Sequence, residues 1–309
     1  MRLIFLGTPT FAVPSLKSLI SAGHDVRTVV TQPDRPKGRG QELAFSPVKQ
    51  CALAHGLEVF QPERIRRPEA VETLRALEVD AMVVVGYGQI IPQAIIDLAP
   101  LGIINVHASL LPEYRGAAPI QWAIANGETV TGVTTMRIDA GLDTGDMLLR
   151  VETPIQPEND ALTLGSRLAA MGANLLMETL AGLQQGTIVP EKQDPAQATY
   201  APMLKKEDGL IDWRLPAGRI HNRVRGFLPW PGAYTRFRGQ TLHIWKSAPG
   251  GPSGRAPGAL RLVGRRLFVG SGDGSALELV EVQLEGKKRV AAEPFANGQR
   301  LTENERLGD

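Results

Sequence analysis

The sequence has a single cysteine among its 309 residues, Cys51. One thiol excludes an intramolecular disulfide and a zinc site built from cysteines, and it is typical of a protein from a reducing compartment. The chain also lacks any uncharged apolar run near the roughly 20 residues that span a bilayer, and its first residues contain no small-residue cleavage site. We therefore expect a cytoplasmic protein that does not insert into a membrane.

Several nucleotide-binding and hydrolase motifs are also missing. The stretch LGTPTF at residues 6–11 holds one glycine, where a dinucleotide-binding turn needs G-x-G-x-x-G. We expect Gly7 to serve the geometry of a tight turn. No Walker, HExxH or GxSxG motif occurs, so phosphoryl transfer, zinc proteolysis and α/β-hydrolase chemistry have no support. His24, His55 and His243 lack a second histidine or a carboxylate at ligand spacing, so we expect no metal.

The net charge of +2 conceals an uneven distribution of charge. From Lys205 to Asp309 there are 18 basic and 11 acidic residues, a net of +7, which leaves −5 for the residues before them. A basic C-terminal third attached to an acidic body is typical of a protein with a polyanionic partner, commonly a nucleic acid. On charge alone, a surface that merely keeps the protein in solution is an equal alternative.

Apolar and amphipathic stretches alternate over the first half of the chain. We expect strands at residues 2–7, 25–32, 57–61, 80–88 and 102–107, and helices at 11–23, 46–56 and 67–78. This alternation predicts an α/β fold with a doubly wound, mostly parallel sheet, in which ligands bind beyond the carboxyl ends of the strands. We assign residues 1–189 to this domain and the turn-rich residues 190–206 to a linker.

The pattern changes after residue 206. Short alternating strands are expected between glycines, at residues 233–239, 240–248, 258–264, 265–272 and 275–284. Strands of this kind predict a small OB-like β-barrel domain over residues 207–309. The basic charge of the C-terminal third lies on this domain, which we therefore expect to bind the polyanion.

A long segment without periodicity, residues 31–49, interrupts the alternation of strands and helices. It contains Arg35, Lys37, Arg39 and Lys49. A basic loop at the carboxyl edge of the sheet could bind phosphates beside an active site. A solvated loop without a ligand is the alternative on these residues alone.

Two polar residues, Asn105 and His107, end the expected strand at 102–107. They are two positions apart, so their side chains leave the same face of the strand. A carboxamide and an imidazole together can polarise a carbonyl whose oxygen becomes negative, and Asp143 in the glycine-rich stretch GLDTGD is a plausible partner for the imidazole. Ser109 is the nearest hydroxyl and no thiol is close, which favours direct transfer to a nucleophile supplied by the substrate.

Four stretches together resemble the methionyl-tRNA formyltransferases: GTPTF at 7–11, NVHASLLPEYRGAAPIQ at 105–121, GVTTMRIDAGLDTGDM at 132–147 and FLPWPGAYT at 227–235. The resemblance covers nearly the whole chain, in the order usual for that family. The motif around Asn105 and GLDTGD is shared with all formyltetrahydrofolate-dependent formyltransferases. The stretches at 31–40, 227–235 and 284–300 are similar to the tRNA enzymes alone.

The resemblance implies that a formyl group passes from 10-formyltetrahydrofolate to the α-amino group of methionine on initiator methionyl-tRNA, for translation initiation. It places the catalytic residues at Asn105, His107 and Asp143. It places the folate-binding run at Ser109, Leu110, Leu111 and Pro112, and the tRNA-binding residues at Arg35, Lys37 and Arg39. In the implied mechanism, Asn105 and His107 donate hydrogen bonds to the formyl oxygen and Asp143 orients the imidazole. We take the protein to be a monomer that needs no metal.

Two other functions stay open at this point. Formylation of a small amine, such as an amino-sugar nucleotide or glycinamide ribonucleotide, would use the same three residues, although the basic C-terminal third and the long loop disfavour it. A non-catalytic RNA-binding module would have no physical need for the three residues together. Arg115 has no assigned role, since it could bind substrate or form a structural ion pair.

Overall fold

The computed structural model describes residues 1–37, 42–302 and 305–308. The chain forms two compact units. The first consists of Met1–Gly116, Thr131–Thr153 and Gly165–Tyr200, and the second of Ala117–Val130, Pro154–Leu164 and Ala201–Asp309. Residues 190–200 therefore belong to the first unit, and two short segments that precede residue 165 belong to the second.

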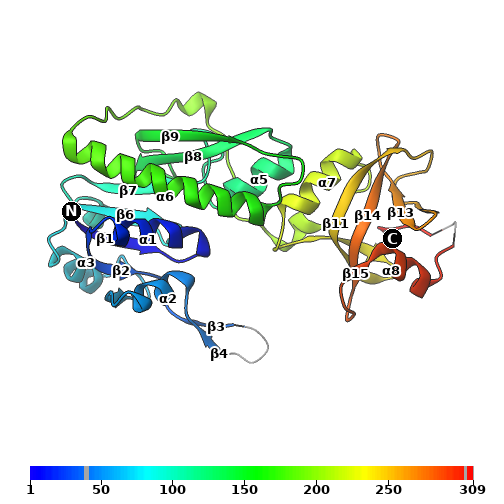
Figure 1. Ribbon diagram of the computed structural model, residues 1–309, viewed down its shortest axis with the longest axis horizontal. Helices are drawn as coiled ribbons and strands as arrows, with labels where there is room; N and C mark the ends of the chain where they lie inside the picture. The colour runs from blue at the N-terminus through cyan, green and yellow to red at the C-terminus, as the bar shows by residue number, and fades with distance from the viewer. Residues whose placement is uncertain (38–41, 303–304, 309) are drawn as a thin grey trace. The chain divides into compact units, whose positions relative to one another are not determined.

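The first unit is built on a seven-stranded sheet (Figure 1). Its strands, in spatial order, are β5 (Val59–Phe60), β2 (Asp25–Val30), β1 (Arg2–Gly7), β6 (Ala81–Val85), β7 (Ile103–His107), β8 (Val130–Arg137) and β9 (Met147–Pro154). The pairings from β5 to β7 are parallel, and β8 runs antiparallel to β7. The predicted α/β fold with a mostly parallel sheet is confirmed.

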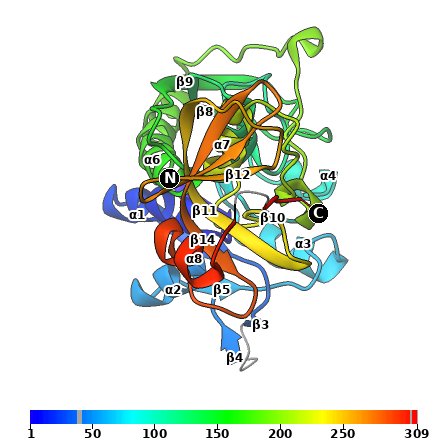
Figure 2. The same cartoon turned by 90° about the vertical axis from the view of Figure 1, so that its right-hand side faces the viewer.

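Helices cover both faces of this sheet, as Figure 2 shows end on. On one side lie α1 (Val13–Ser21), α2 (Pro47–Ala54) and α6 (Ala161–Gln185), and on the other lie α3 (Pro68–Arg75) and α4 (Gln93–Ile96). All five residues of β6 are buried, because both of its faces are covered. The short 3₁₀ helices of this unit are η1 (Thr10–Ala12) and η2 (Pro195–Gln197).

Part of the segment at 31–49 is ordered as a hairpin rather than as an aperiodic loop. Strand β3 (Arg35–Lys37) pairs antiparallel with β4 (Glu42–Ala44). Strands of three residues are too short to show the alternation of apolar and polar residues that marks a strand. The sequence pattern therefore predicted a loop. The segment closes at Ser46, whose side chain caps α2 by accepting a hydrogen bond from the Lys49 amide at 3.0 Å.

The second unit contains an antiparallel sheet in the order β10-β11-β14-β13-β12, with β15 paired to β14. The strands are β10 (Ala233–Phe237), β11 (Gln240–Pro252), β12 (Leu260–Val263), β13 (Arg266–Gly270), β14 (Ser275–Leu284) and β15 (Val290–Ala291). The helices are α5 (Pro119–Asn126), η3 (Lys206–Gly209), α7 (Ala217–Gly226) and α8 (Ala292–Gln299). The five predicted strands are present, but over the described residues no pairing of β10 with β12 closes the sheet into a barrel.

None of the described helices is long and apolar enough to cross a membrane. Within the same part of the chain, no group of three or more histidine, cysteine, aspartate or glutamate side chains could hold a metal ion.

Candidate active site

Strand β7 presents Asn105 and His107 on one face and Val106 on the other. A methyl group on Gly172 of α6 would lie 2.7 Å from Val106 Cγ1, so α6 covers the Val106 face. Asn105 and His107 therefore project to the opposite side, beyond Ile103, which is part of the core packed by α3 and α4. The two side chains lie where the helical cover ends, at the carboxyl end of β7.

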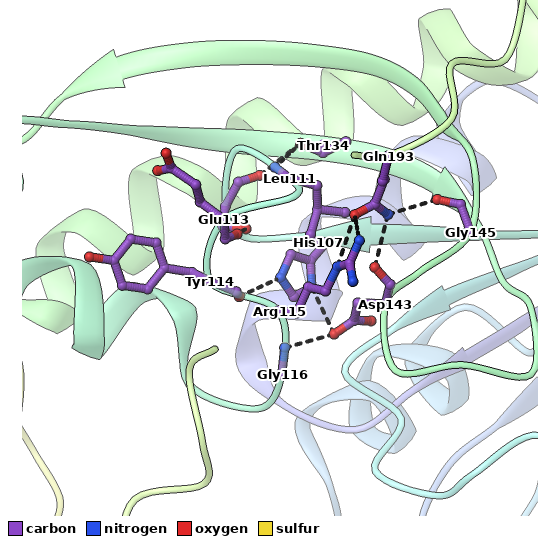
Figure 3. A network of polar contacts seen from close by, with 11 residues as sticks. His107, Leu111, Glu113, Tyr114, Arg115, Gly116, Thr134, Asp143, Gly145 and Gln193 are labelled. Atoms are coloured by element: carbon purple, nitrogen blue, oxygen red, sulfur yellow. Dashed lines mark hydrogen bonds and ion pairs between the residues drawn. The ribbon is translucent and has the colours of Figure 1, made fainter. Parts of the chain in front are cut away.

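His107 contacts main chain on one side and a carboxylate on the other (Figure 3). Its Nε2 lies 3.0 Å from the carbonyl oxygen of Tyr114. A carbonyl only accepts, so Nε2 carries the hydrogen in this contact. Nδ1 faces Asp143 Oδ2 at 3.7 Å. The structure thus brings His107 and Asp143 together, although they are far apart in sequence.

Asn105 has a carboxamide that is available to a ligand. The residue is 9% exposed and His107 is 6% exposed, so both side chains are largely shielded from water. Within residues 1–37, 42–302 and 305–308, the Asn105 side chain forms no hydrogen bond. In the antiparallel pair of β7 and β8, Asn105 lies opposite Met136, which packs with Leu111 and Met147. A hydrogen-bond donor beside an apolar cluster is strongest where charge develops away from water.

Asp143 lies on the loop between β8 and β9 in the left-handed region, with φ of 51°. Its Oδ2 accepts a hydrogen bond from the Gly116 amide at 2.8 Å. The loop passes so close to β8 that a methyl group on Gly145 would lie 1.9 Å from the carbonyl oxygen of Arg137. The glycines of the GLDTGD stretch therefore serve close packing of the chain.

Gln193 is a site residue that the sequence analysis missed. Its Nε2 donates to the carbonyl oxygens of Asp143 at 2.8 Å and Gly145 at 2.7 Å. Its Oε1 accepts from Arg115 Nε at 3.0 Å and Nη2 at 2.7 Å. Arg115 is thus joined to the Asp143 loop through one amide (Figure 3). No pattern in the turn-rich residues around Gln193 signals this contact.

Residues 1–180 match the formyl transferase family, and residues 203–300 match the formyl transferase C-terminal domain. The chain belongs to the formyltransferase family. The methionyl-tRNA formyltransferase of Solibacter usitatus (strain Ellin6076) is 70% identical to it, over 100% of this chain and 99% of the relative. That of Koribacter versatilis (strain Ellin345) is 60% identical over 100% of this chain and 99% of the relative.

Solved structures share the fold of this formyltransferase at low sequence identity. The sugar 3N-formyl transferase WlaRD, solved with dTDP and 5-N-formyl-THF, has a TM-score of 0.69 at 19% identity, covering 93% of this chain and 99% of its own. The N-formyltransferase from Helicobacter canadensis, in complex with folinic acid and dTDP-3-aminofucose, has a TM-score of 0.68 at 19% identity, covering 90% and 98%. These likenesses bear on the fold alone.

The predicted folate-binding run of the formyltransferase, Ser109 to Pro112, is fixed by Thr134 of β8. Thr134 Oγ1 donates to the Ser109 carbonyl at 2.8 Å and accepts from the Leu111 amide at 3.1 Å. The Ser109 hydroxyl donates to the Glu113 carbonyl at 2.6 Å. These polar groups are engaged within the protein, so the run can offer a ligand a preformed wall with Leu110 and Pro112 half-buried.

Apolar side chains stand exposed near the same carboxyl edge of the sheet. Leu142, next to Asp143, is 61% exposed, and Ile90, on the loop after β6, is 91% exposed. Sequence reasoning singled out neither of these exposed side chains.

The structure describes some of the basic residues predicted to bind phosphates in the segment 31–49, but not all of them. Arg35 is exposed on β3. Lys37 ends β3, and Arg39 lies outside the described residues. Lys49 forms an ion pair with Asp34. The hydrogen bond from Lys49 is the main reason why the pKa of the Asp34 carboxyl is lowered, and a hydrogen bond from Gln61 contributes less. Lys49 is thus engaged in holding the base of the hairpin.

A second surface of the formyltransferase lies on the outer face of β10, β11 and β14. It contains a cavity of about 390 Å³ lined by aromatic and charged side chains. Tyr234 pairs in register with His243, and their ring centroids are 5.9 Å apart. The His243 ring stacks on Trp245 at 5.7 Å, and the Arg289 guanidinium lies 5.2 Å from the Trp245 ring. Burial lowers the pKa of His243, which favours a neutral ring for stacking.

Proposed function

We propose that this formyltransferase transfers the formyl group of 10-formyltetrahydrofolate to the α-amino group of methionine on initiator methionyl-tRNA. The observation that carries the proposal is 70% identity, over the full length, to a protein named methionyl-tRNA formyltransferase. The first unit would then hold the catalytic residues, and the part assigned to residues 207–309 would bind tRNA. Relatives this similar give no support to formylation of a small amine.

The reaction replaces one bond to the formyl carbon by another. 10-Formyltetrahydrofolate supplies the formyl group on its N10. The α-amine forms a new bond to the formyl carbon, the bond from that carbon to N10 breaks, and the proton lost by the amine replaces the formyl group on N10. The protein must stabilise the negative charge that develops on the formyl oxygen and move one proton.

Asn105 is the residue best suited to the developing charge. Its carboxamide has no competing hydrogen bond among the described residues, and the residue is only 9% exposed. A donor of this kind, aimed at an oxyanion, contributes about 10²- to 10³-fold to turnover. The carboxamide would donate to the formyl oxygen more strongly as charge builds on it.

His107 would act through Nδ1, because its Nε2 hydrogen is bound by the Tyr114 carbonyl. Nδ1 faces Asp143 Oδ2 at 3.7 Å, and a proton on it would lie at the carboxyl end of β7 that also carries Asn105. It can stabilise the formyl oxygen, and the same nitrogen, when unprotonated, can take the amine proton directly or through water. The Asp143 carboxylate would orient the ring and balance its charge.

The acceptor assay tests this proposal directly. We expect the protein to formylate methionyl initiator tRNA with 10-formyltetrahydrofolate and to leave free methionine unmodified. The activity at subsaturating tRNA should fall as salt rises, because phosphate contacts release counterions. Equal rates on free methionine and on charged tRNA, with no salt dependence, would contradict the proposal.

The outer face of the second unit gives a separate prediction about tRNA binding. Trp245→Leu should raise KM for charged tRNA by about 5- to 30-fold, because an unpaired base loses a stacking partner. KM for the folate and kcat should change little. The Trp245 indole also donates to Gln283 Oε1 at 2.9 Å, so thermal unfolding must confirm that the variant is folded.

Phe268→Leu is a matched control for this prediction. Arg266 lies over the Phe268 ring at 5.0 Å, which gives the same kind of pair on β13 of the same unit, but Phe268 does not line the cavity. An unchanged KM for tRNA in Trp245→Leu, or an equal rise in the control, would rule out binding at this face.

A further inference from the structure

Arg115 has a buried guanidinium whose hydrogen-bond partner is a neutral side-chain amide. The residue is 4% exposed, and among the described residues its side chain forms no ion pair. A buried cation is costly unless its hydrogens are bound and its charge has a use. Its Nε and Nη2 hydrogens both converge on one acceptor, Gln193 Oε1, at 3.0 and 2.7 Å. The guanidinium therefore donates both hydrogen bonds to the uncharged side-chain amide of Gln193.

This arrangement fixes which way the Gln193 amide points. Guanidinium groups have donors and no acceptor, so the amide oxygen must face Arg115. Carbonyl groups accept and cannot donate, so the amide nitrogen must face the oxygens of Asp143 and Gly145. Charge on the guanidinium polarises the amide and strengthens the hydrogen bonds that its nitrogen donates. Both sides of the amide require the same orientation.

The Gln193 amide nitrogen donates hydrogen bonds to the main chain on both sides of Thr144. Asp143 has a positive φ of 51°, a conformation that a residue with a side chain keeps only when its surroundings enforce it. The start of the loop is held separately, since Asp139 Oδ1 accepts from the Gly141 amide at 3.0 Å and from Thr144 Oγ1 at 2.7 Å. The Gln193 bonds constrain the end of the loop that carries the Asp143 carboxylate.

Three consecutive residues after the folate-binding run each hold one part of the site (Figure 3). The Tyr114 carbonyl binds His107 Nε2, and the Gly116 amide binds Asp143 Oδ2. Arg115, between them, holds Gln193. This short segment is itself fixed, because the Tyr114 amide donates to Thr199 Oγ1 and the Arg115 amide to the Thr199 carbonyl. The segment therefore fixes the His107 imidazole and the Asp143 carboxylate relative to each other.

We propose that Arg115 and Gln193 are positioning residues for formyl transfer, which hold the Asp143 carboxylate against His107 by gripping the main chain of its loop. The inference rests on the proposed function, in which Asp143 acts on His107. Neither residue needs to touch a substrate. They act by fixing the position of Asp143, so substitution of either residue should lower kcat and leave substrate binding nearly unchanged.

The test uses Gln193→Glu in the full chain. A glutamate keeps the size of the side chain and an acceptor for Arg115, but it has no hydrogen to donate to the two carbonyls. We expect kcat for formylation of methionyl-tRNA to fall about 10- to 100-fold, as misplacement of a catalytic group by about 1 Å does. Both KM values should stay within about two-fold of wild type. Gln193→Met, which also lacks the donor, should behave alike.

A second readout is independent of activity. The Gly116 amide donates to the Asp143 carboxylate, so hydrogen exchange at Gly116 reports where that carboxylate lies. In Gln193→Glu, exchange at this amide should accelerate by about 10-fold or more, while global stability stays near that of wild type. Gln197→Glu is the matched control, because Gln197 is an exposed residue of η2 whose side chain, within the described residues, hydrogen-bonds to Asp194.

Combination with Asp143→Asn shows whether Gln193 acts through Asp143. If it does, Gln193→Glu should slow the Asp143→Asn enzyme by less than about three-fold, since residues that act as a unit are not additive. Wild-type kcat together with wild-type exchange at Gly116 in folded Gln193→Glu overturns the inference, as do fully additive losses. A wild-type protein that formylates no charged tRNA would instead defeat the proposed function, and the exchange at Gly116 would still decide the positioning claim.

Discussion

Asp143→Asn is expected to lower kcat by about 10²- to 10⁴-fold, the range by which positioned acid–base groups accelerate proton transfer. The carboxamide oxygen can still accept the hydrogen bond from the Gly116 amide, so the loop should keep its conformation. What is lost is the negative charge 3.7 Å from His107 Nδ1. KM for tRNA and for the folate should change far less than kcat, in steady-state kinetics with folded protein.

Asp139→Asn is the control for this change. Asp139 lies on the same loop and is exposed, and a single oxygen, Oδ1, accepts both of its hydrogen bonds. An asparagine oxygen can accept both, so the variant removes one charge from the loop without removing a contact. We expect near wild-type kcat for it. Similar losses of kcat in Asp139→Asn and Asp143→Asn would mean that the effect comes from the total charge of the loop and not from Asp143 itself.

Asn105→Ala is expected to lower kcat by about 10²- to 10³-fold, because it removes the carboxamide that we propose as the donor to the developing oxyanion. The carboxamide has no hydrogen bond to lose within the described part of the chain, so the free energy of unfolding should change little. Measurements of kcat and of thermal unfolding on the same preparation separate the two effects.

Asn105→Asp provides a stricter form of this test. The aspartate keeps the shape of the side chain but replaces the donor nitrogen by an acceptor oxygen, which repels the oxyanion. It should be at least as slow as Asn105→Ala. A folded Asn105→Asp enzyme with kcat within about three-fold of wild type would contradict the role of Asn105 as an oxyanion donor.

The sequence predicted the parts of the site that depend on one strand. Alternation along β7 is enough to put Asn105 and His107 on one face, and the carboxyl end of a parallel strand is where ligands bind in such folds. The GLDTGD stretch contributed Asp143 because a carboxylate on a turn next to the strand is a natural partner for an imidazole. In the structure Asp143 lies beside His107, 3.7 Å from its Nδ1.

The sequence did not reveal the residues that hold this set in place. Arg115 and Gln193 are 78 positions apart, and their contact depends on how the chain returns along the β8–β9 loop. A glutamine among turn residues carries no periodic signal, and Arg115 could not be told from an ion-pair residue until its neighbours were known. The β3–β4 hairpin was missed for a related reason, because its strands are too short to show a period.

Direct transfer without a covalent enzyme intermediate is the central claim, and one measurement tests it most directly. The protein is mixed with 10-formyltetrahydrofolate labelled in the formyl group, first alone and then with methionyl initiator tRNA, and the label on protein and on tRNA is followed in a single turnover. We predict no label on the protein at any time, and one formyl group per active site on the tRNA after its addition. A formylated protein that forms without tRNA and then passes its label to tRNA would contradict the account.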